Sequence, residues 1–214
     1  MELAVLFQND YFVVIDKPAG ILSVPSRLGS RETRLVAGLL LESQLGSRVW
    51  PTHRLDEGVS GALMFALNPE AHRAANAWFE AGKVFKTYEA ISAQDAGLKV
   101  GESFSWKCSL MRGKKRAYIN DKIGKISITE GHIEAQVGPY FKWILHPKTG
   151  RSHQLRFELF RHGAPIVGDE LYGGQAWAVP GIGLRSLELN LEGIPQNMRF
   201  DLPNVIAAPR MNWC

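Results

Sequence analysis

The sequence contains few cysteines and no long hydrophobic run. Its two cysteines, Cys108 and Cys214, form neither a CxxC motif nor a zinc-ligand spacing, and such sparse use suits a reducing compartment. No apolar run approaches the ~20 residues of a transmembrane helix. The first residues, MELAVLFQNDYF, lack the basic start of a secretory signal. A cytoplasmic protein without a membrane span is therefore expected.

Strong charge, repeats and nucleotide-binding loops are also missing. The net charge of +4 permits a nucleic-acid partner without requiring one. No glycine-rich segment leads into the Lys-Ser/Thr pair of a P-loop. With 45% hydrophobic residues, the chain can bury a full core as one large domain or two small ones. The lack of a long linker favours one domain over residues 1–214.

Strands are predicted where short apolar or β-branched runs are bounded by turn residues. They cover residues 3–7, 11–16, 62–67, 83–92 and 184–191, two strands within 132–145 broken at Gly138-Pro139, and a strand with a turn in 165–174. The tail, residues 195–214, contains prolines and is expected to be extended on the surface. Many strands without regular β-α-β alternation indicate an α+β fold.

Two helices are predicted in the first half of the chain. One covers residues 31–45 and should end before Gly46. Its apolar residues at helical spacing are Leu35, Leu39 and Leu40. The other is bounded by Asn68, a typical cap that Pro69 follows, and by Gly82. Apolar residues recur along it at helical spacing, so we expect it to cover one face of a sheet.

A basic pair and a carboxylate stand together in residues 51–63, PTHRLDEGVSGAL. Asp56 lies two positions after Arg54, just before an apolar strand. Nearby positive charge would keep Asp56 ionised as a nucleophile. The alternative is an aspartate that closes a turn and is tied down by Arg54. Taken alone, the tetrapeptide favours this alternative, because charged loop residues mostly serve turns and solvation.

A third helix is predicted after Ser152. Its apolar residues and its stop are Leu155, Leu159, Phe160 and Gly163. Thr149 and Ser152 are both residue types that cap helices, and Ser152 would share a helix face with Arg156. An arginine among apolar neighbours needs a partner if it is buried, and Asp56 is a suitable one. The alternative is a surface arginine that pairs with Glu158.

Residues 107–125 are rich in lysine and arginine and hold one acid, Asp121. The core of this basic run consists of Arg112, Lys114, Lys115 and Arg116. Such a run is typical of a solvated hairpin tip. It is also the most concentrated surface in the sequence for neutralising RNA phosphates. Both interpretations can hold at once.

These segments together resemble the RluA family of pseudouridine synthases. The first family motif resembles His53-Arg54-Leu55-Asp56 followed by Ser60-Gly61. The second resembles Lys86-x-Tyr88, and the third resembles TGRSHQLR at 149–156. Two further segments, KPAG at 17–20 and PIVGDELYGG at 165–174, also have family counterparts in the same order. The resemblance implies one catalytic domain on a mixed, mainly antiparallel sheet with flanking helices, and no separate RNA-binding domain before Lys17. It also implies that a specific uridine in structured rRNA or tRNA is isomerised to pseudouridine.

The resemblance assigns roles to individual residues. Asp56 would be the nucleophile or base, and Arg156 would hold it ionised. Tyr88, otherwise an ordinary half-buried strand tyrosine, would stack on the flipped base and assist proton transfer. Further RNA contacts are expected at His53, Arg54, Arg151, His153, Gln154 and Leu155. The core of the basic run matches the family poorly, and its contact with RNA is expected from its charge alone. The implied partner is an RNA stem-loop bound by a monomer, and neither a metal nor a nucleotide cofactor is expected.

Two other functions stay open at this level. Family members usually have Thr where Val59 stands, which favours a catalytically weak protein that binds and remodels RNA with the same fold. A glycoside hydrolase would need two carboxylates flanking the bond. Only Asp56 has motif support, because the adjacent Glu57 would point elsewhere on an extended segment.

Overall fold

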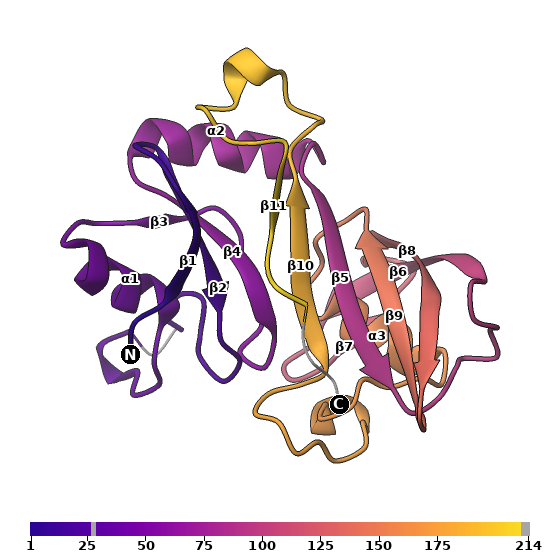
Figure 1. The fold of residues 1–214 in the computed structure, drawn as a ribbon. Coiled ribbons are helices and arrows are strands. Elements are labelled where there is room, and N and C mark those ends of the chain that lie inside the picture. The colour runs from indigo at the N-terminus through magenta and orange to yellow at the C-terminus, as the bar shows by residue number, and fades with distance from the viewer. Residues whose placement is uncertain (27–28, 211–214) are drawn as a thin grey trace. The chain divides into compact units, whose positions relative to one another are not determined.

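The computed structural model describes residues 1–26 and 29–210. The chain forms two compact units, here called unit 1 (Met1–Phe85 and Arg185–Cys214) and unit 2 (Lys86–Leu184), which Figure 1 traces along the chain. Cys214 and the end of the predicted tail lie outside the described residues. No helix in the described part of the chain has the length and apolar character needed to cross a bilayer. One domain over residues 1–214 stays a prediction.

Unit 1 contains strands with mixed pairing. Their bounds are β1 (Ala4–Gln8), β2 (Phe12–Lys17), β3 (Trp50–Pro51), β4 (Ser60–Ala66), β10 (Leu184–Asn190, whose first residue belongs to unit 2) and β11 (Val205–Ala207). β1, β2, β4 and β10 follow one another in space, while β3 pairs with β4 and β11 with β10. β4 and β10 run parallel, and the other pairs are antiparallel.

β4 and β10 approach each other closely at Gly61. Its φ is +107°, and a Cβ at this position would lie 2.1 Å from the carbonyl oxygen of Ser186. Only glycine combines this backbone angle with so close an approach. Gly61, which follows the Asp56 segment, is therefore explained by the pairing of β4 with β10.

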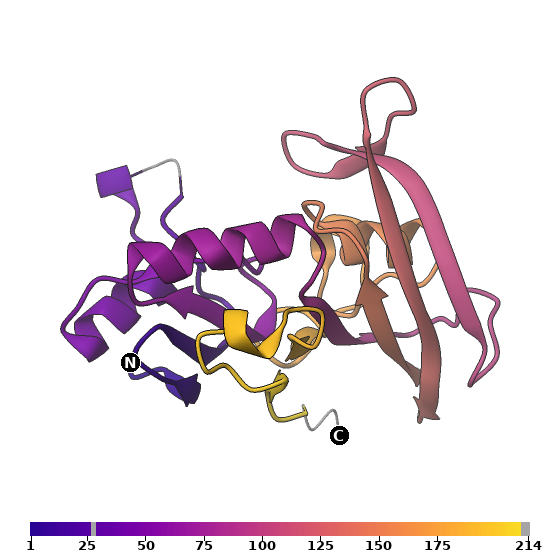
Figure 2. The same ribbon diagram turned by 90° about the horizontal axis from the view of Figure 1, so that it is seen from above.

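α2 (Pro69–Glu80) confirms the helix predicted between Asn68 and Gly82. The Asn68 side chain accepts a hydrogen bond from Ala71 N at 2.9 Å, as an N-cap does. The buried side of α2 packs on the strands of unit 1, across which it lies in Figure 2. This core includes Phe12, Val14, Met64, Trp78 and Leu189.

α1 spans Ala37–Leu45, so the predicted start at residue 31 is wrong. The preceding segment is extended because Leu22 N donates to Leu35 O at 2.9 Å, a contact between segments that local periodicity does not encode. Leu35 and Leu39, which were expected on the apolar side, are 51% and 54% exposed. The predicted end before Gly46 is confirmed.

The tail is less exposed than predicted. Leu202 and Ile206 are each 5% exposed within the core of unit 1, and β11 pairs with β10. Residues Gln196–Met198 form a 3₁₀ helix. An extended surface tail is therefore wrong for this stretch, because the apolar residues between the prolines reach a core formed by distant parts of the chain.

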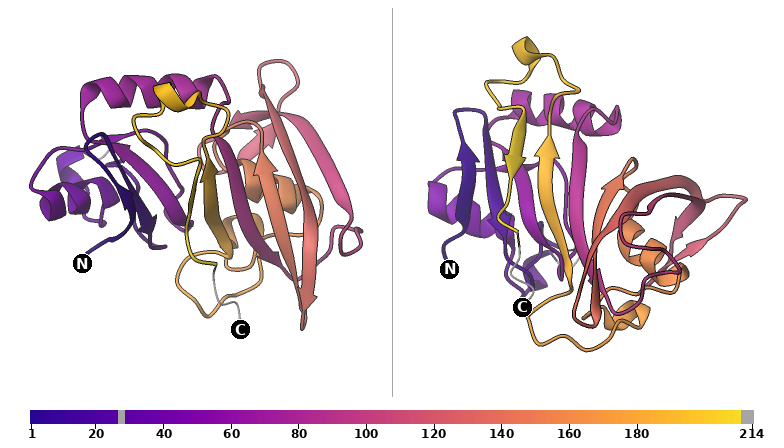
Figure 3. Two further views of the ribbon diagram at one scale, coloured as in Figure 1. Left: turned by 45° about the horizontal axis from the view of Figure 1, so that its top comes forward. Right: turned by 45° about the vertical axis from the view of Figure 1, so that its right-hand side comes forward.

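Unit 2 contains antiparallel strands in the spatial order β5, β9, β8, β6 and β7. Their bounds are β5 (Phe85–Ser92, whose first residue belongs to unit 1), β6 (Ser103–Arg112), β7 (Ala117–Ile119), β8 (Lys125–Val137) and β9 (Tyr140–Pro147). α3 (Gln154–Arg161) contacts β7, β8 and β9, and Figure 3 shows the strands curving around it. The predicted break at Gly138 is confirmed, as is the α+β class with mixed, mainly antiparallel strands.

The segment 165–174 contains less strand than predicted. Ile166 pairs with Ser92 as a single bridge, and Glu170–Tyr172 form a 3₁₀ helix. This 3₁₀ helix ends at Tyr172, whose side chain is 1% exposed. The predicted strand is therefore wrong beyond that bridge, and the predicted turn is confirmed at Gly173.

Candidate active site

Asp56 opens a turn in the loop that leads into β4. Val59 N donates to Asp56 O at 3.1 Å, and the flanking Leu55 and Val59 are buried. Asp56 itself is half-buried. The structure thus confirms that Asp56 takes part in a turn, and a fixed turn also suits a carboxylate that must be held in position. Because Val59 is 3% exposed, valine there leaves no buried hydroxyl to satisfy.

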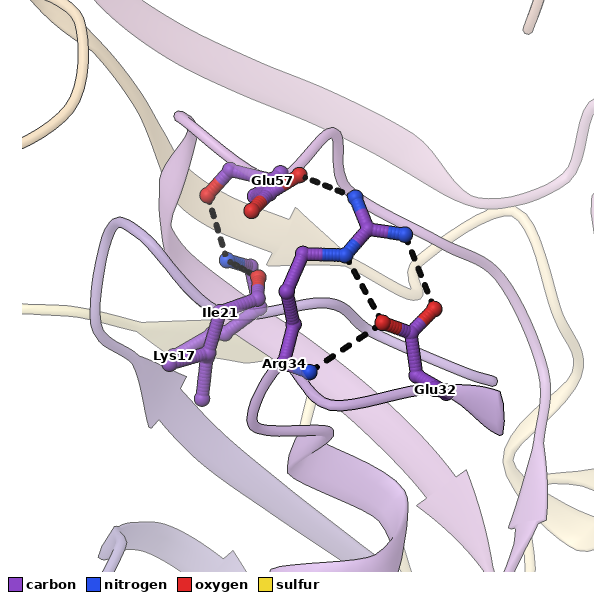
Figure 4. Close-up of polar contacts among 5 residues, drawn as sticks. All are labelled: Lys17, Ile21, Glu32, Arg34 and Glu57. Atoms are coloured by element: carbon purple, nitrogen blue, oxygen red, sulfur yellow. Dashed lines mark hydrogen bonds and ion pairs between the residues drawn. The ribbon is translucent and has the colours of Figure 1, made fainter. Parts of the chain in front are cut away.

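A buried ammonium group lies beneath this loop. Lys17 is fully buried, and its Nζ donates to the carbonyl oxygens of Pro18, Ile21 and Glu57 at 2.9, 2.8 and 3.3 Å. Figure 4 shows the contacts with Ile21 and Glu57. Burial lowers the pKa of Lys17 to about 8, and the charges of Glu57 and Asp56 oppose this lowering. Sequence reasoning gave Lys17 no role, although a lysine ending an otherwise apolar strand was a usable signal.

Arg34 supports the loop from a second direction. Its Nη1 donates to Glu57 Oε2 at 2.8 Å, while Nε and Nη2 each donate to the Glu32 carboxylate at 2.8 Å (Figure 4). The side-chain hydrogen bond from Arg34 lowers the pKa of Glu32 to about 2. Since the Glu57 carboxylate is engaged by Arg34, a glycoside hydrolase that pairs it with Asp56 is disfavoured.

Lys17→Met should show how the buried ammonium group affects stability and its dependence on pH. We expect a loss of roughly 3 kcal/mol in the free energy of unfolding at neutral pH, because buried carbonyl oxygens lose their donor. The pKa of Lys17 is about 8 in the folded protein against the ordinary 10.5, so the unfolded chain binds more protons between these values. The wild type should therefore gain stability relative to the variant as pH rises through that interval. Urea unfolding of both proteins measures the difference between their free energies of unfolding. A difference that becomes smaller as pH rises would contradict the expectation.

The predicted RNA contacts of unit 1 differ in exposure. His53 is half-buried, its Nε2 accepts a hydrogen bond from Met64 N at 3.1 Å, and its ring lies 4.8 Å from that of Phe79. Arg54 is exposed. His53 is thus anchored to β4 and α2, whereas Arg54 is available to a ligand. Their roles toward RNA stay predictions.

In unit 2, Tyr88 lies on β5 with 9% of its side chain exposed. It is opposite Leu145 of β9, which in turn is opposite Gly131 of β8, so these residues share one face of the sheet. Thr129 is two residues before Gly131 and shares that face. The Gln154 side chain donates to Thr129 Oγ1 at 3.0 Å, which places the start of α3 over the same face as Tyr88.

The start of α3 differs from the prediction. His153 is its N-cap, with a φ of 56°, and neither Thr149 nor Ser152 caps the helix. Thr149 Oγ1 instead accepts from Ile128 N at 3.0 Å and donates to Gln154 Oε1 at 2.8 Å. The prediction that Ser152 and Arg156 share a helix face is therefore wrong, because Ser152 precedes the helix. Gln154 is 4% exposed, with its amide engaged within unit 2.

Arg156 forms a bidentate ion pair with Asp169. Arg156 Nε and Nη2 donate to the two carboxylate oxygens at 2.6 and 2.8 Å, and the guanidinium carbon lies 5.3 Å from the centre of the Tyr172 ring. Asp169 is 1% exposed, so this pair is largely removed from water. Sequence reasoning missed Asp169, although it lies in the matched PIVGDELYGG segment. The assignment of Arg156 to Asp56 stays a prediction.

The remaining predicted contacts of the third motif are also placed within unit 2. Arg151 Nε donates to Ile126 O at 2.9 Å. His153 Nδ1 lies 3.1 Å from the Tyr172 hydroxyl, and Leu155 is 7% exposed. Most of this segment is therefore locked into the unit by its own contacts, which fixes the loop that precedes α3.

The basic run forms the tip of the β6–β7 hairpin. Its members Arg112, Lys114, Lys115 and Arg116 are all exposed. Lys115 and Arg116, with Glu170 and Leu171, line an open cavity of about 710 Å³. The Arg116 guanidinium lies 5.8 Å from the Tyr172 ring centre. The hairpin tip is confirmed, and contact with RNA stays a prediction.

The predicted catalytic residues are distributed over both units, with Asp56 in unit 1 and Tyr88 and Arg156 in unit 2. Residues 11–161 match the family model described as RNA pseudouridylate synthase. The chain belongs to this family. The family confirms the resemblance to the RluA-type enzymes, and the protein is an RNA pseudouridine synthase. That Asp56, Tyr88 and Arg156 form one catalytic site stays a prediction.

Relatives and solved structures agree with this membership. A tRNA pseudouridine synthase C from Haemophilus ducreyi is 37% identical over 183 residues, covering 81% of this chain and 75% of that one. A ribosomal large subunit pseudouridine synthase D from Pseudomonas aeruginosa is 27% identical, covering 100% of this chain and 68% of that one. The solved structure of human RNA pseudouridylate synthase domain containing 1 has a TM-score of 0.70 at 25% identity, covering 89% of this chain and 79% of that one.

Proposed function

We propose that this synthase converts a specific uridine of structured tRNA or rRNA to pseudouridine, with Asp56 as the catalytic carboxylate. The observation that carries the proposal is the bracing of the Asp56 turn by Lys17 and Arg34, which both bind the adjacent Glu57. Such support keeps a reacting group within its productive geometry. The tRNA class is favoured, because a relative named for tRNA is 37% identical and the one named for the ribosomal large subunit is 27% identical.

The proposed reaction rearranges one nucleoside. The target base leaves its stack, the bond between C1′ and N1 breaks, the uracil turns, and C5 bonds to C1′. Tyr88 supplies a flat ring against the base and a hydroxyl for proton transfer. Whether Asp56 attacks the sugar or the base is left open. We further propose that the protein acts as a monomer on an RNA stem-loop in the cytoplasm.

Tritium release tests this function directly. Uridine labelled at C5 loses its tritium when C5 becomes bonded to C1′, so purified protein should release tritium from tRNA or rRNA transcripts. Mapping pseudouridine in the products then identifies the site. If the protein binds these RNAs but releases no tritium from either class, the catalytic proposal fails and RNA remodelling becomes the better account.

The basic run offers a separate prediction about RNA binding. Changing Arg112, Lys114, Lys115 and Arg116 to alanine should weaken binding, because these exposed cations would meet phosphates. Each lost phosphate contact should lower the log–log salt slope by roughly 0.7 to 0.9. The modified site and the rate at saturating RNA should be preserved, since phosphate contacts position RNA without reading bases. Filter binding over a salt series measures the slope, and an unchanged slope would assign the run to solvation alone.

A further inference from the structure

Lys86 of unit 2 is a half-buried lysine that has no counter-ion in the described part of the chain. Among the described residues its Nζ donates no hydrogen bond and forms no ion pair. Burial lowers the pKa of its ammonium group, and no carboxylate contributes an opposing effect. A buried cation that gains nothing from the fold costs stability, and such violations of packing rules concentrate at functional sites.

The position of Lys86 links it to the second and third motifs. Lys86 and Tyr88 are two residues apart on β5, so their side chains point to the same face. This is the face that carries the start of α3, through the contact of Gln154 with Thr129. The ammonium group therefore lies beside the surface on which Tyr88 would receive the target base.

Lys86 Nζ lies next to the backbone of the loop before α3. A Cβ built on Gly150 would lie 3.9 Å from Nζ, which is ordinary van der Waals contact, and Gly150 itself is exposed. Half-buried, without a partner among the described residues and next to an exposed loop residue, Lys86 is arranged to meet a group supplied by the substrate.

We propose that Lys86 Nζ contacts a carbonyl oxygen of the target uracil and stabilises the negative charge that the base acquires during the reaction. This inference rests on the proposed function. If the C1′–N1 bond breaks first, its electron pair stays on N1 and is shared with O2 and O4. If C6 is attacked first, the charge is carried by C5 and O4. In both cases the charge later disappears, because C5 bonds to C1′ and loses its proton, N1 is protonated, and the bond that the attacking carboxylate formed to C1′ or C6 breaks and releases it.

A backbone phosphate is the other anion that could meet this lysine. Its charge is present before, during and after the reaction, so a phosphate contact would strengthen binding without favouring the transition state. Exposed cations such as Arg112 and Lys114 are better placed for that task than a half-buried lysine. Uracil is therefore the partner we infer, and the phosphate becomes an outcome of the test.

The test compares Lys86→Met and Lys86→Gln with Lys142→Met. Lys142, also in unit 2, has a carboxylate partner in Glu134 at 3.5 Å and serves as the matched control. Loss of a group that stabilises developing charge should lower the single-turnover rate at saturating RNA by about a hundredfold. RNA affinity and its salt slope should stay as in the wild type. The melting temperature should be unchanged or higher, since no protein partner of Lys86 is lost.

Three outcomes would overturn the inference. Wild-type rates in both Lys86 variants would show that the ammonium group does not act in the reaction. Weaker binding with a flatter salt slope, at an unchanged saturated rate, would identify a phosphate contact. A rate loss of equal size in Lys142→Met would make the effect a general consequence of lost charge. If the wild type itself produced no pseudouridine, the proposed function would fail, and that result is distinct from all three.

Discussion

Asp56→Asn is expected to lower the rate of pseudouridine formation by at least roughly a thousandfold, while RNA affinity changes by less than about tenfold. Asparagine nearly preserves the shape of the side chain but can act neither as a nucleophile nor as a base. The turn that holds it should persist, because its hydrogen bond runs between backbone atoms of Asp56 and Val59. Single-turnover tritium release and filter binding on the same RNA separate the two quantities.

Asp10→Asn is the matched control for this change. Asp10 is an exposed aspartate of unit 1 in the turn between β1 and β2, so the substitution alters the net charge equally. We expect its rate and affinity to equal those of the wild type. Full activity in Asp56→Asn would remove Asp56 from the mechanism, and a large loss of affinity would make it a docking residue instead.

Asp169→Asn is expected to destabilise the protein by roughly 3 kcal/mol and to impair turnover as well. The substitution removes the charge that the guanidinium of Arg156 meets through two hydrogen bonds. With Asp169 1% exposed, water cannot replace the lost interaction fully. For a chain of this size, the loss corresponds to a fall of about 6–12 °C in melting temperature. Thermal unfolding followed by circular dichroism measures it.

Two further variants separate stability from activity in this pair. Glu170→Gln changes the exposed neighbour of Asp169 and should leave the melting temperature within about 1 °C. The double variant Arg156→Met/Asp169→Leu removes both charges and should recover much of the stability. It should remain inactive if Arg156 serves the reaction. Recovered activity in the double variant would reduce the pair to a structural role.

Local patterns predicted the elements whose signals lie within a few residues. Asn68, Pro69 and Gly82 bound α2 because capping and helix termination depend on nearby backbone groups. The sequence did not reveal that Leu35 and Val36 lie outside the helix, since their conformation depends on contact with Leu22. The same limit applies to the start of α3, where Thr149 binds Ile128 of a distant strand rather than capping the helix.

By itself the sequence determined the family and the class of reaction. It carries contiguous motifs, such as the one that ends at Asp56, whose residue types and order are readable without a structure. Only the tertiary structure decided the partners of the charged groups, because they are separated along the chain. Lys17 reaches Glu57, Arg156 reaches Asp169, and Lys86 lies beside Gly150 with no counter-ion among the residues that the structure describes. Burial and charge pairing depend on which segments the fold brings together, and no local propensity encodes that choice.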